Sequence, residues 1–237
     1  MKIDFCSEDM ILKVYPTISG CFEEAWGVMR KYFLILFLAI IVGGLMDVPM
    51  GYKQYILGGD DSFSVGLSLL SLLGFIYYLL VVSPFNYGVD WLFLQAARNK
   101  DPLFEEIFFG FKKLCFVILS HLLVIGLVGM GIVLLIIPSI YLAIKLIFVP
   151  FLIMDKNVDP IQAVKLSFYL SKGYFWTIFG MAILSFFIII LGIACLVVGV
   201  FVSLIWVHAA FAILYKALEE LHYKEACEAA GIILSEE

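Results

Sequence analysis

The chain has 237 residues, of which 64% are hydrophobic and 15% are charged, with a formal net charge of −5. Soluble domains are nearer half apolar, and a soluble chain of this length could not bury so much apolar surface. The composition therefore excludes a soluble globular domain and predicts an all-α, polytopic membrane helix bundle. The sequence has no basic tract, so nucleic acid is excluded as a partner.

Six apolar segments are predicted to cross the membrane, because about 20 apolar helical residues span the ~30 Å hydrocarbon core. The first follows an acidic stretch, so we expect an uncleaved signal anchor and no cleaved signal peptide. Ser83-Pro84 is expected to kink the second span, and Pro138 to begin the fourth. The predicted spans are 32–48, 63–85, 114–136, 138–154, 174–191 and 197–216 of one membrane domain.

Basic residues give the expected orientation. Nearly all of the 15 Lys and Arg residues flank the spans on one side, whereas Lys53 lies on the other and Lys145 lies within a span. Cytoplasmic loops carry the excess of Lys and Arg. We therefore expect a multi-pass protein of the cell membrane with both termini in the cytoplasm.

An internal repeat links two parts of the chain. Residues 22–45 are FEEAWGVMRKYFLILFLAIIVGGL and residues 104–127 are FEEIFFGFKKLCFVILSHLLVIGL, with the same acidic pair, basic pair and closing Gly-Leu. Asp101-Pro102 and Asp159-Pro160 are good helix starts, and a span follows each of these short helices. The pattern predicts three units, each a short interfacial helix followed by a hairpin of two spans. Packing at the membrane rim is preferred for the short helices over lipid recognition, since they have no polybasic face.

The stretch FVPFLIMDKNVDPIQAVKLSFYLSKGYFWTIFG at residues 148–180, with LLIIPSIYLAIKL at residues 134–146, carries a resemblance to a known family. It resembles a bacterial six-span integral membrane protein family of unknown function, related to the membrane domain of glycerophosphoryl diester phosphodiesterases. The resemblance implies a helical fold in the cytoplasmic membrane and brings no established activity. The resemblance covers nearly the whole chain and corresponds to the membrane domain of those phosphodiesterases, without their catalytic domain. It therefore implies no phosphodiesterase activity.

Motifs of catalysis and metal binding are absent from the sequence. It contains no Walker A loop, HExxH, GxSxG or CxxC pair, and the spacing of its five cysteines favours neither a zinc site nor a disulfide framework. We therefore expect no enzyme and no cofactor. Haem ligation by His121 and His208 is a third, minor interpretation of the two histidines within spans.

Four ionisable residues on four spans are expected at one depth. Asp90, His121 and His208 each lie eight residues from a basic marker of the cytoplasmic side, or roughly 12 Å along a helix, and Lys145 lies roughly 15 Å in. Ionisable groups inside a membrane usually face a partner or water. The four are interpreted either as a site that holds a substrate or relays protons, or as structural pairs. Lys145 is predicted to pair with Asp90 or to have a histidine beside it.

Two function classes remain open from the sequence. The preferred one is a non-enzymatic membrane scaffold or accessory subunit, and the alternative is a small transporter or lipid-handling protein with a polar site inside the bundle. A cavity that reaches Asp90 or Lys145 favours the alternative, whereas dry, tightly paired residues favour the scaffold. The expected partners are membrane lipids, with other membrane proteins or a second copy of the chain.

Overall fold

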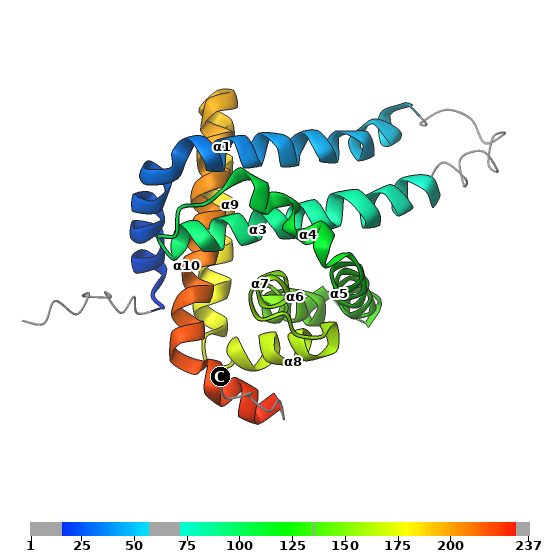
Figure 1. The fold of residues 1–237 in the computed structure, drawn as a ribbon, viewed down its shortest axis with the longest axis vertical. Coiled ribbons are helices and arrows are strands. Elements are labelled where there is room, and N and C mark those ends of the chain that lie inside the picture. Colours follow the sequence, from blue (N-terminus) through cyan, green and yellow to red (C-terminus); the bar gives the residue numbers. More distant parts are fainter. Residues whose placement is uncertain (1–15, 57–71, 135, 231–237) are drawn as a thin grey trace, which may run out of the picture.

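The computed structural model describes residues 16–56, 72–134 and 136–230, and this part of the chain contains helices and no β-strand. Within it, six helices are long and apolar enough to cross a membrane. The prediction of an all-α polytopic bundle is therefore confirmed. The helices form three consecutive units, each a short helix followed by a hairpin (Figure 1).

The first unit contains α1 (Ile18–Ile56), which bends at Tyr32, and a second helix that ends at Ala97. That second helix is described from Leu72 and includes a π-helical turn, η1 (Tyr78–Val82), before α3 (Ser83–Ala97). Proline has no N–H to donate, and the π-helical turn accommodates it without ending the helix. The helix therefore continues well past residue 85, where the sequence pattern placed the end of the span.

The second unit begins with η2 (Phe104–Phe108) and α4 (Phe109–Lys112), and its outer span is α5 (Leu114–Leu134). The predicted fourth span is divided into α6 (Ile136–Lys145) and α7 (Val149–Lys156). The division has a local cause, since Pro150 cannot donate the hydrogen bond that would continue the helix through residues 146–148. Pro138 lies in the first turn of α6, as expected for the start of that helix.

The third unit contains α8 (Pro160–Leu170), α9 (Phe175–Ala194) and α10 (Leu196–Ala230). The predicted spans 174–191 and 197–216 coincide with α9 and with the first part of α10. The remainder of α10 is a mixed polar extension that buries Cys227 on one side. Figure 1 shows α9 and α10 side by side, while the hairpin of α1 and α3 points in a different direction.

The same backbone bend precedes each outer span. Tyr32 has φ −115° and ψ 23°, Lys113 has φ −112° and ψ 31°, and Tyr174 has φ −108° and ψ 15°. The two segments aligned in the sequence, residues 22–45 and 104–127, therefore share one shape, in which a short helix, a bend and a span follow one another. The common bend sets the angle at which each hairpin leaves its short helix.

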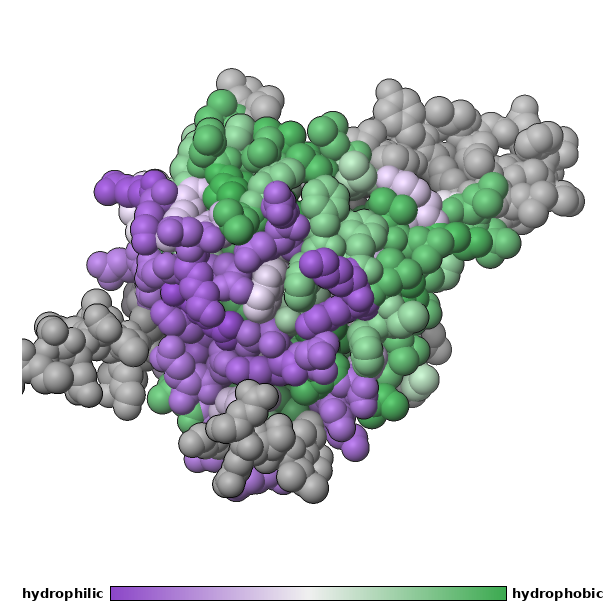
Figure 2. All heavy atoms as spheres, viewed as in Figure 1, coloured by the Kyte–Doolittle hydropathy of each residue, from purple (hydrophilic) through white to green (hydrophobic). Residues whose placement is uncertain are grey.

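The two spans of each hairpin differ in burial. In the first span of each hairpin, 17 to 28% of the residues in an apolar 18-residue stretch are buried inside the protein. In the second span the share is 39 to 56%. The second spans, α3, α6–α7 and α10, are therefore the inner spans, and the first spans are the outer ones. Figure 2 shows hydrophilic side chains over the base where the hairpins meet and hydrophobic side chains over the projecting helices.

Each short helix packs against the inner span of another hairpin. The first part of α1 lies on α10, where the Trp206 indole N–H donates to the Phe22 carbonyl over 2.8 Å. The η2–α4 segment lies on α3, and its backbone approaches so closely that a Cβ at Gly88 would collide with the Ile107 carbonyl. In both places the short helix is in direct contact with an inner span that belongs to a different hairpin.

The third short helix completes the pattern. α8 lies along α6–α7, and the Ser167 hydroxyl donates to the Lys145 carbonyl over 2.7 Å. The short helix of the second unit thus packs on the first hairpin, that of the third on the second, and that of the first on the third. The three units form a closed ring of contacts, which we call the short-helix ring.

Candidate functional site

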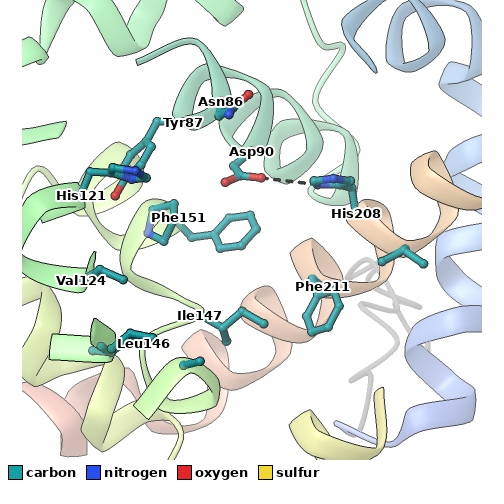
Figure 3. A pocket seen from close by; sticks show the side chains of 14 residues that line it. Asn86, Tyr87, Asp90, His121, Val124, Leu146, Ile147, Phe151, His208 and Phe211 are labelled. Atoms are coloured by element: carbon teal, nitrogen blue, oxygen red, sulfur yellow. Dashed lines mark ion pairs between the residues drawn. The ribbon is translucent and has the colours of Figure 1, made fainter. Parts of the chain in front are cut away.

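A partly open cavity of about 490 Å³ lies between the inner spans and α5. Most of the side chains that line it are apolar, including Val124, Phe151 and Phe211. The volume falls within the range of about 300–1,000 Å³ typical of small-molecule sites. Figure 3 shows polar side chains on α3 and, on either side of them, one from α5 and one from α10, with apolar side chains facing them. Those polar residues are Asn86, Tyr87, Asp90, His121 and His208.

Asp90 of α3 and His208 of α10 lie together at the edge of the cavity. The His208 Nδ1 lies 3.6 Å from the Asp90 Oδ1, which is close enough for an ion pair but too long for a hydrogen bond. The imidazole is stacked on the Phe93 ring at 5.3 Å between centroids, and this contact fixes its plane. The Asp90 side chain keeps 20% of its surface exposed, so its carboxylate is available to a ligand in the cavity.

His121 reaches the same cavity from α5. Its ring lies between Tyr78 and Tyr87, with centroids 5.3 and 6.2 Å away. The Tyr87 hydroxyl is within 3.2 Å of the Ser120 hydroxyl and is thereby occupied. The His121 Nε2 is buried and has no hydrogen-bond partner among the described residues. Three of the four residues singled out in the sequence therefore line one cavity.

Lys145 does not belong to this group. Its side chain is turned toward α8, where the ammonium donates to the Ser171 carbonyl over 2.8 Å and lies beside the rings of Tyr141 and Phe168. Lys145 is only 4% exposed. The prediction that it pairs with Asp90 or has a histidine beside it is wrong.

The physical reason lies in the path of α8. This helix has 11 residues, or about 16 Å, and it runs back along α6–α7 so that its last turn reaches the level of Lys145. The C-terminus of a helix carries a partial negative charge on its free carbonyls. The Lys145 ammonium therefore finds its counter-charge at a helix end, where the sequence suggested a carboxylate.

A second polar group, which the sequence did not indicate as a site, joins the ends of the three inner spans. Arg98 donates two hydrogen bonds to Asp155, over 2.5 and 2.7 Å, and a third to Glu219 over 2.5 Å. Lys156 pairs with Glu219, and the Tyr215 hydroxyl donates to Asp155 over 3.2 Å. Burial opposes the charge of Arg98, but its bonds to Asp155 raise the pKa of the guanidinium above its ordinary value. We call these five residues the ion-pair cluster.

Two lysines close the same end of the molecule. The Lys113 ammonium donates to the carbonyls of Ile153 and Met154 at the end of α7, over 3.2 and 3.0 Å. Lys216 does the same for the Ala97 carbonyl at the end of α3, over 3.3 Å. Cations at helix C-termini are stabilising, so these contacts and the ion-pair cluster hold the inner spans together.

The ion-pair cluster was not predicted from the sequence, because Arg98 and Lys156 were interpreted there only as basic residues that flank the spans. The signal was nonetheless present, since Asp155 and Glu219 are acids beside the basic residues that end two inner spans. Asn86 was missed as well. It precedes Asp90 by four residues, which places the two side chains on one face of α3.

The cavity is suited to binding and offers no metal site. Within residues 16–56, 72–134 and 136–230, no group of three or more His, Cys, Asp or Glu side chains could hold a metal ion. His121 and His208 lie on different walls of the cavity, and His208 is engaged by Asp90 and Phe93 (Figure 3). The arrangement can hold a molecule that is apolar over most of its surface and polar at one end.

No family model, curated protein or solved structure matches this chain. The fold places it among polytopic helical membrane proteins.

Proposed function

We propose that this membrane protein is a lipid-handling protein, which binds one membrane-dissolved amphiphilic molecule in the cavity between its inner spans. The observation that carries the proposal is the partly open cavity of about 490 Å³ with apolar walls and Asp90 in its edge. Placing a carboxylate beside apolar walls costs free energy, because the charge loses contact with water. Ionisable residues within spans commonly mark a substrate path. Hydrocarbon fits the walls, and a polar group fits the edge.

A scaffold or accessory subunit is the second candidate, and particular contacts favour it. Lys145 is buried and its ammonium donates to the Ser171 carbonyl, and the ion-pair cluster ties three inner spans together. The outer spans also expose large apolar side chains, such as Leu119 and Phe186, which suit lipids, other membrane proteins or a second copy of the chain. The scaffold interpretation does not explain Asp90, because this residue faces a cavity and lacks a hydrogen bond to any described residue. We therefore place lipid handling first.

The location and orientation belong to the same proposal. The positive-inside distribution of Lys and Arg supports a cell-membrane protein whose termini and ion-pair cluster lie on the cytoplasmic side. The resemblance of residues 148–180 to the family related to glycerophosphoryl diester phosphodiesterase membrane domains agrees with that location. We propose binding without catalysis, since the sequence contains no Walker A, HExxH or GxSxG motif.

Filling the cavity with a large side chain tests the proposal. Val124 lines the cavity on α5, and the next residue, Ile125, is 44% exposed and does not line it. Val124→Trp therefore blocks the cavity, while Ile125→Trp places the same ring at the same depth outside it. The wild-type protein and both variants are extracted in a mild detergent, and native mass spectrometry measures any bound molecule.

We expect a bound species of lipid-like mass on the wild-type protein and on Ile125→Trp, and its loss from Val124→Trp. Gel filtration checks that both variants remain folded. Equal occupancy in the two variants, or no bound species in the wild type, would show that the cavity binds no membrane amphiphile, and the scaffold interpretation would then replace the proposal.

A further inference from the structure

We infer that the molecule bound in the cavity carries an ammonium group, which the Asp90 carboxylate receives. This inference rests on the proposed function and names the chemistry of the ligand. It begins from charge: the described side chains that line the cavity include one acid, Asp90, and no Lys or Arg. An anionic head would meet the Asp90 charge with no Lys or Arg side chain of the cavity lining to offset it.

The carboxylate has unused acceptor capacity. An ionised carboxylate offers about four lone-pair sites. The contact of Asp90 with His208, at 3.6 Å, is beyond hydrogen-bond range, and no other described residue donates to Asp90. A carboxylate in apolar surroundings is stabilised strongly by an opposite charge and by donors. An ammonium group supplies both, with three N–H donors.

Neighbouring groups complete the environment of an ammonium. Asn86 lies one helical turn from Asp90, lines the same cavity and makes no hydrogen bond to a described residue, so its amide oxygen is free to accept a second N–H. The rings of Phe151 and Phe211 face the same space in Figure 3. Aromatic faces attract cations within about 6 Å of the ring centroid. His208, held by Phe93, limits the depth of the head group on the other side.

The remaining wall defines the rest of the ligand. Val124, Val128 and Ile147 offer only hydrocarbon, and the cavity is partly open. One alkyl chain fits such a wall, and longer parts of a ligand can extend through the opening. The ligand class is therefore an amphiphile with an ammonium head, either the ethanolamine head of a membrane lipid or a free long-chain amine.

A comparison of dodecylamine with dodecan-1-ol isolates the contribution of the ammonium group to binding, because the two molecules share the alkyl chain and differ in the head group. Each is titrated into the purified full-length protein in a mild detergent, and native mass spectrometry gives the apparent Kd. We expect the amine to bind wild-type protein about tenfold or more tightly than the alcohol, as a charge-assisted hydrogen bond provides. In Asp90→Asn this preference should be lost, with alcohol binding unchanged. Asp159→Asn is the matched control, since Asp159 is exposed and its side chain makes no cap bond.

The two natural sources are compared in the same assay. If wild-type protein binds phosphatidylethanolamine more tightly than phosphatidylglycerol, and Asp90→Asn binds the two lipids equally, the ammonium belongs to a lipid head group. Preference for dodecylamine without preference between the lipids assigns it to a free amine. Asp90→Ser serves as a second variant if Asp90→Asn does not yield folded protein.

Failure of this inference differs from failure of the proposed function. If the amine and the alcohol bind equally, or if Asp90→Asn retains the preference, the ammonium assignment is overturned while blockage by Val124→Trp still supports a cavity ligand. If Val124→Trp leaves every ligand bound as before, the cavity is not the binding site and both proposals are overturned.

Discussion

Asn99 and Asn157 have the same left-handed backbone, with φ of 54° and 53°, immediately after two different inner spans. The sequences around them are RNKDP at residues 98–102 and KNVDP at residues 156–160. After α3 the Asn99 N–H donates to the Ala96 carbonyl over 3.0 Å, and the next N–H donates to Gln95 over 3.1 Å. This is the Schellman arrangement that ends a helix, and asparagine accepts the left-handed conformation better than most residues.

These asparagines should tolerate glycine and reject β-branched residues. We expect Asn157→Gly to unfold at the wild-type temperature or slightly above, because glycine adopts positive φ freely. Asn157→Val should lose about 1–2 kcal/mol, the cost of the left-handed region for an L-residue with a side chain. Thermal unfolding in detergent measures both, and the same pair at Asn99 should behave alike. Equal losses for Gly and Val would contradict the backbone argument.

Removing Arg98 should expose the strength of the ion-pair cluster. Arg98→Met leaves Asp155, which is 6% exposed, without its two-bond partner, and breaking such a buried pair costs about 3–5 kcal/mol. Adding Asp155→Asn should recover part of the loss, because the unpaired charge is then gone. Arg30→Met, at an exposed position, serves as the control. If the stability losses of Arg98→Met and Asp155→Asn simply add in the double variant, the two side chains are not coupled.

Lys145 acts as a cap of α8, so its removal should not depend on Asp90. We expect Lys145→Met to lose about 1 kcal/mol of stability, the usual worth of a cation at a helix C-terminus. The loss should be the same with Asp90 intact and with Asp90→Asn, since the two side chains do not meet. A smaller loss in the double variant, measured by thermal unfolding, would restore the pairing predicted from the sequence.

Glu106 should make stability depend on pH. Its Oε2 is buried without a partner among the described residues, and burial raises the pKa of the carboxyl above 4.5, although the Leu103 backbone and Lys100 oppose the shift. The folded state therefore holds this proton more tightly than the unfolded state. Its contribution is most favourable below the unfolded pKa and is lost as the pH rises through the folded pKa.

Replacing the carboxyl by an amide should remove this dependence. Relative to wild type, Glu106→Gln should gain stability as the pH rises from about 4 to about 8. Thermal unfolding across that range measures the difference between the two proteins. Parallel curves for the two would mean that Glu106 does not titrate differently in the folded state.

Reporter fusions test the proposed orientation. Fusions after Lys100, Asn157 and Glu225 should be active with a cytoplasmic reporter, because these points follow the inner spans and their basic residues. A fusion after Ile56 should be active only with a reporter that works outside the membrane. An outside signal after Asn157 would contradict a topology of six spans.

Local chemistry in the sequence was sufficient to predict the helices and where they start. Apolar length identified the spans, and the predicted span starts at residues 32 and 114 fall within one residue of the bends at Tyr32 and Lys113. Proline was less informative, since its effect depends on the surrounding backbone. Pro84 is absorbed by a π-helical turn, whereas Pro150 accompanies a break.

The candidate site was predictable only in part, because depth along a helix does not give direction around it. Asp90, His121 and His208 were placed at one level from their distances to basic residues, and they do share a cavity. Lys145 has a comparable depth but faces α8. Its partner is a backbone carbonyl, and no residue type in the sequence marks a helix end that folds back from elsewhere.

The short-helix ring has a consequence for the order of folding. The first short helix finds its partner on α10, and the bond from Trp206 to Phe22 joins residues 184 positions apart. During synthesis, the apolar face of that helix stays uncovered until the last span has entered the membrane. A chain that stops before α10 therefore keeps an open ring, and its first short helix lacks the surface that covers it in the complete fold.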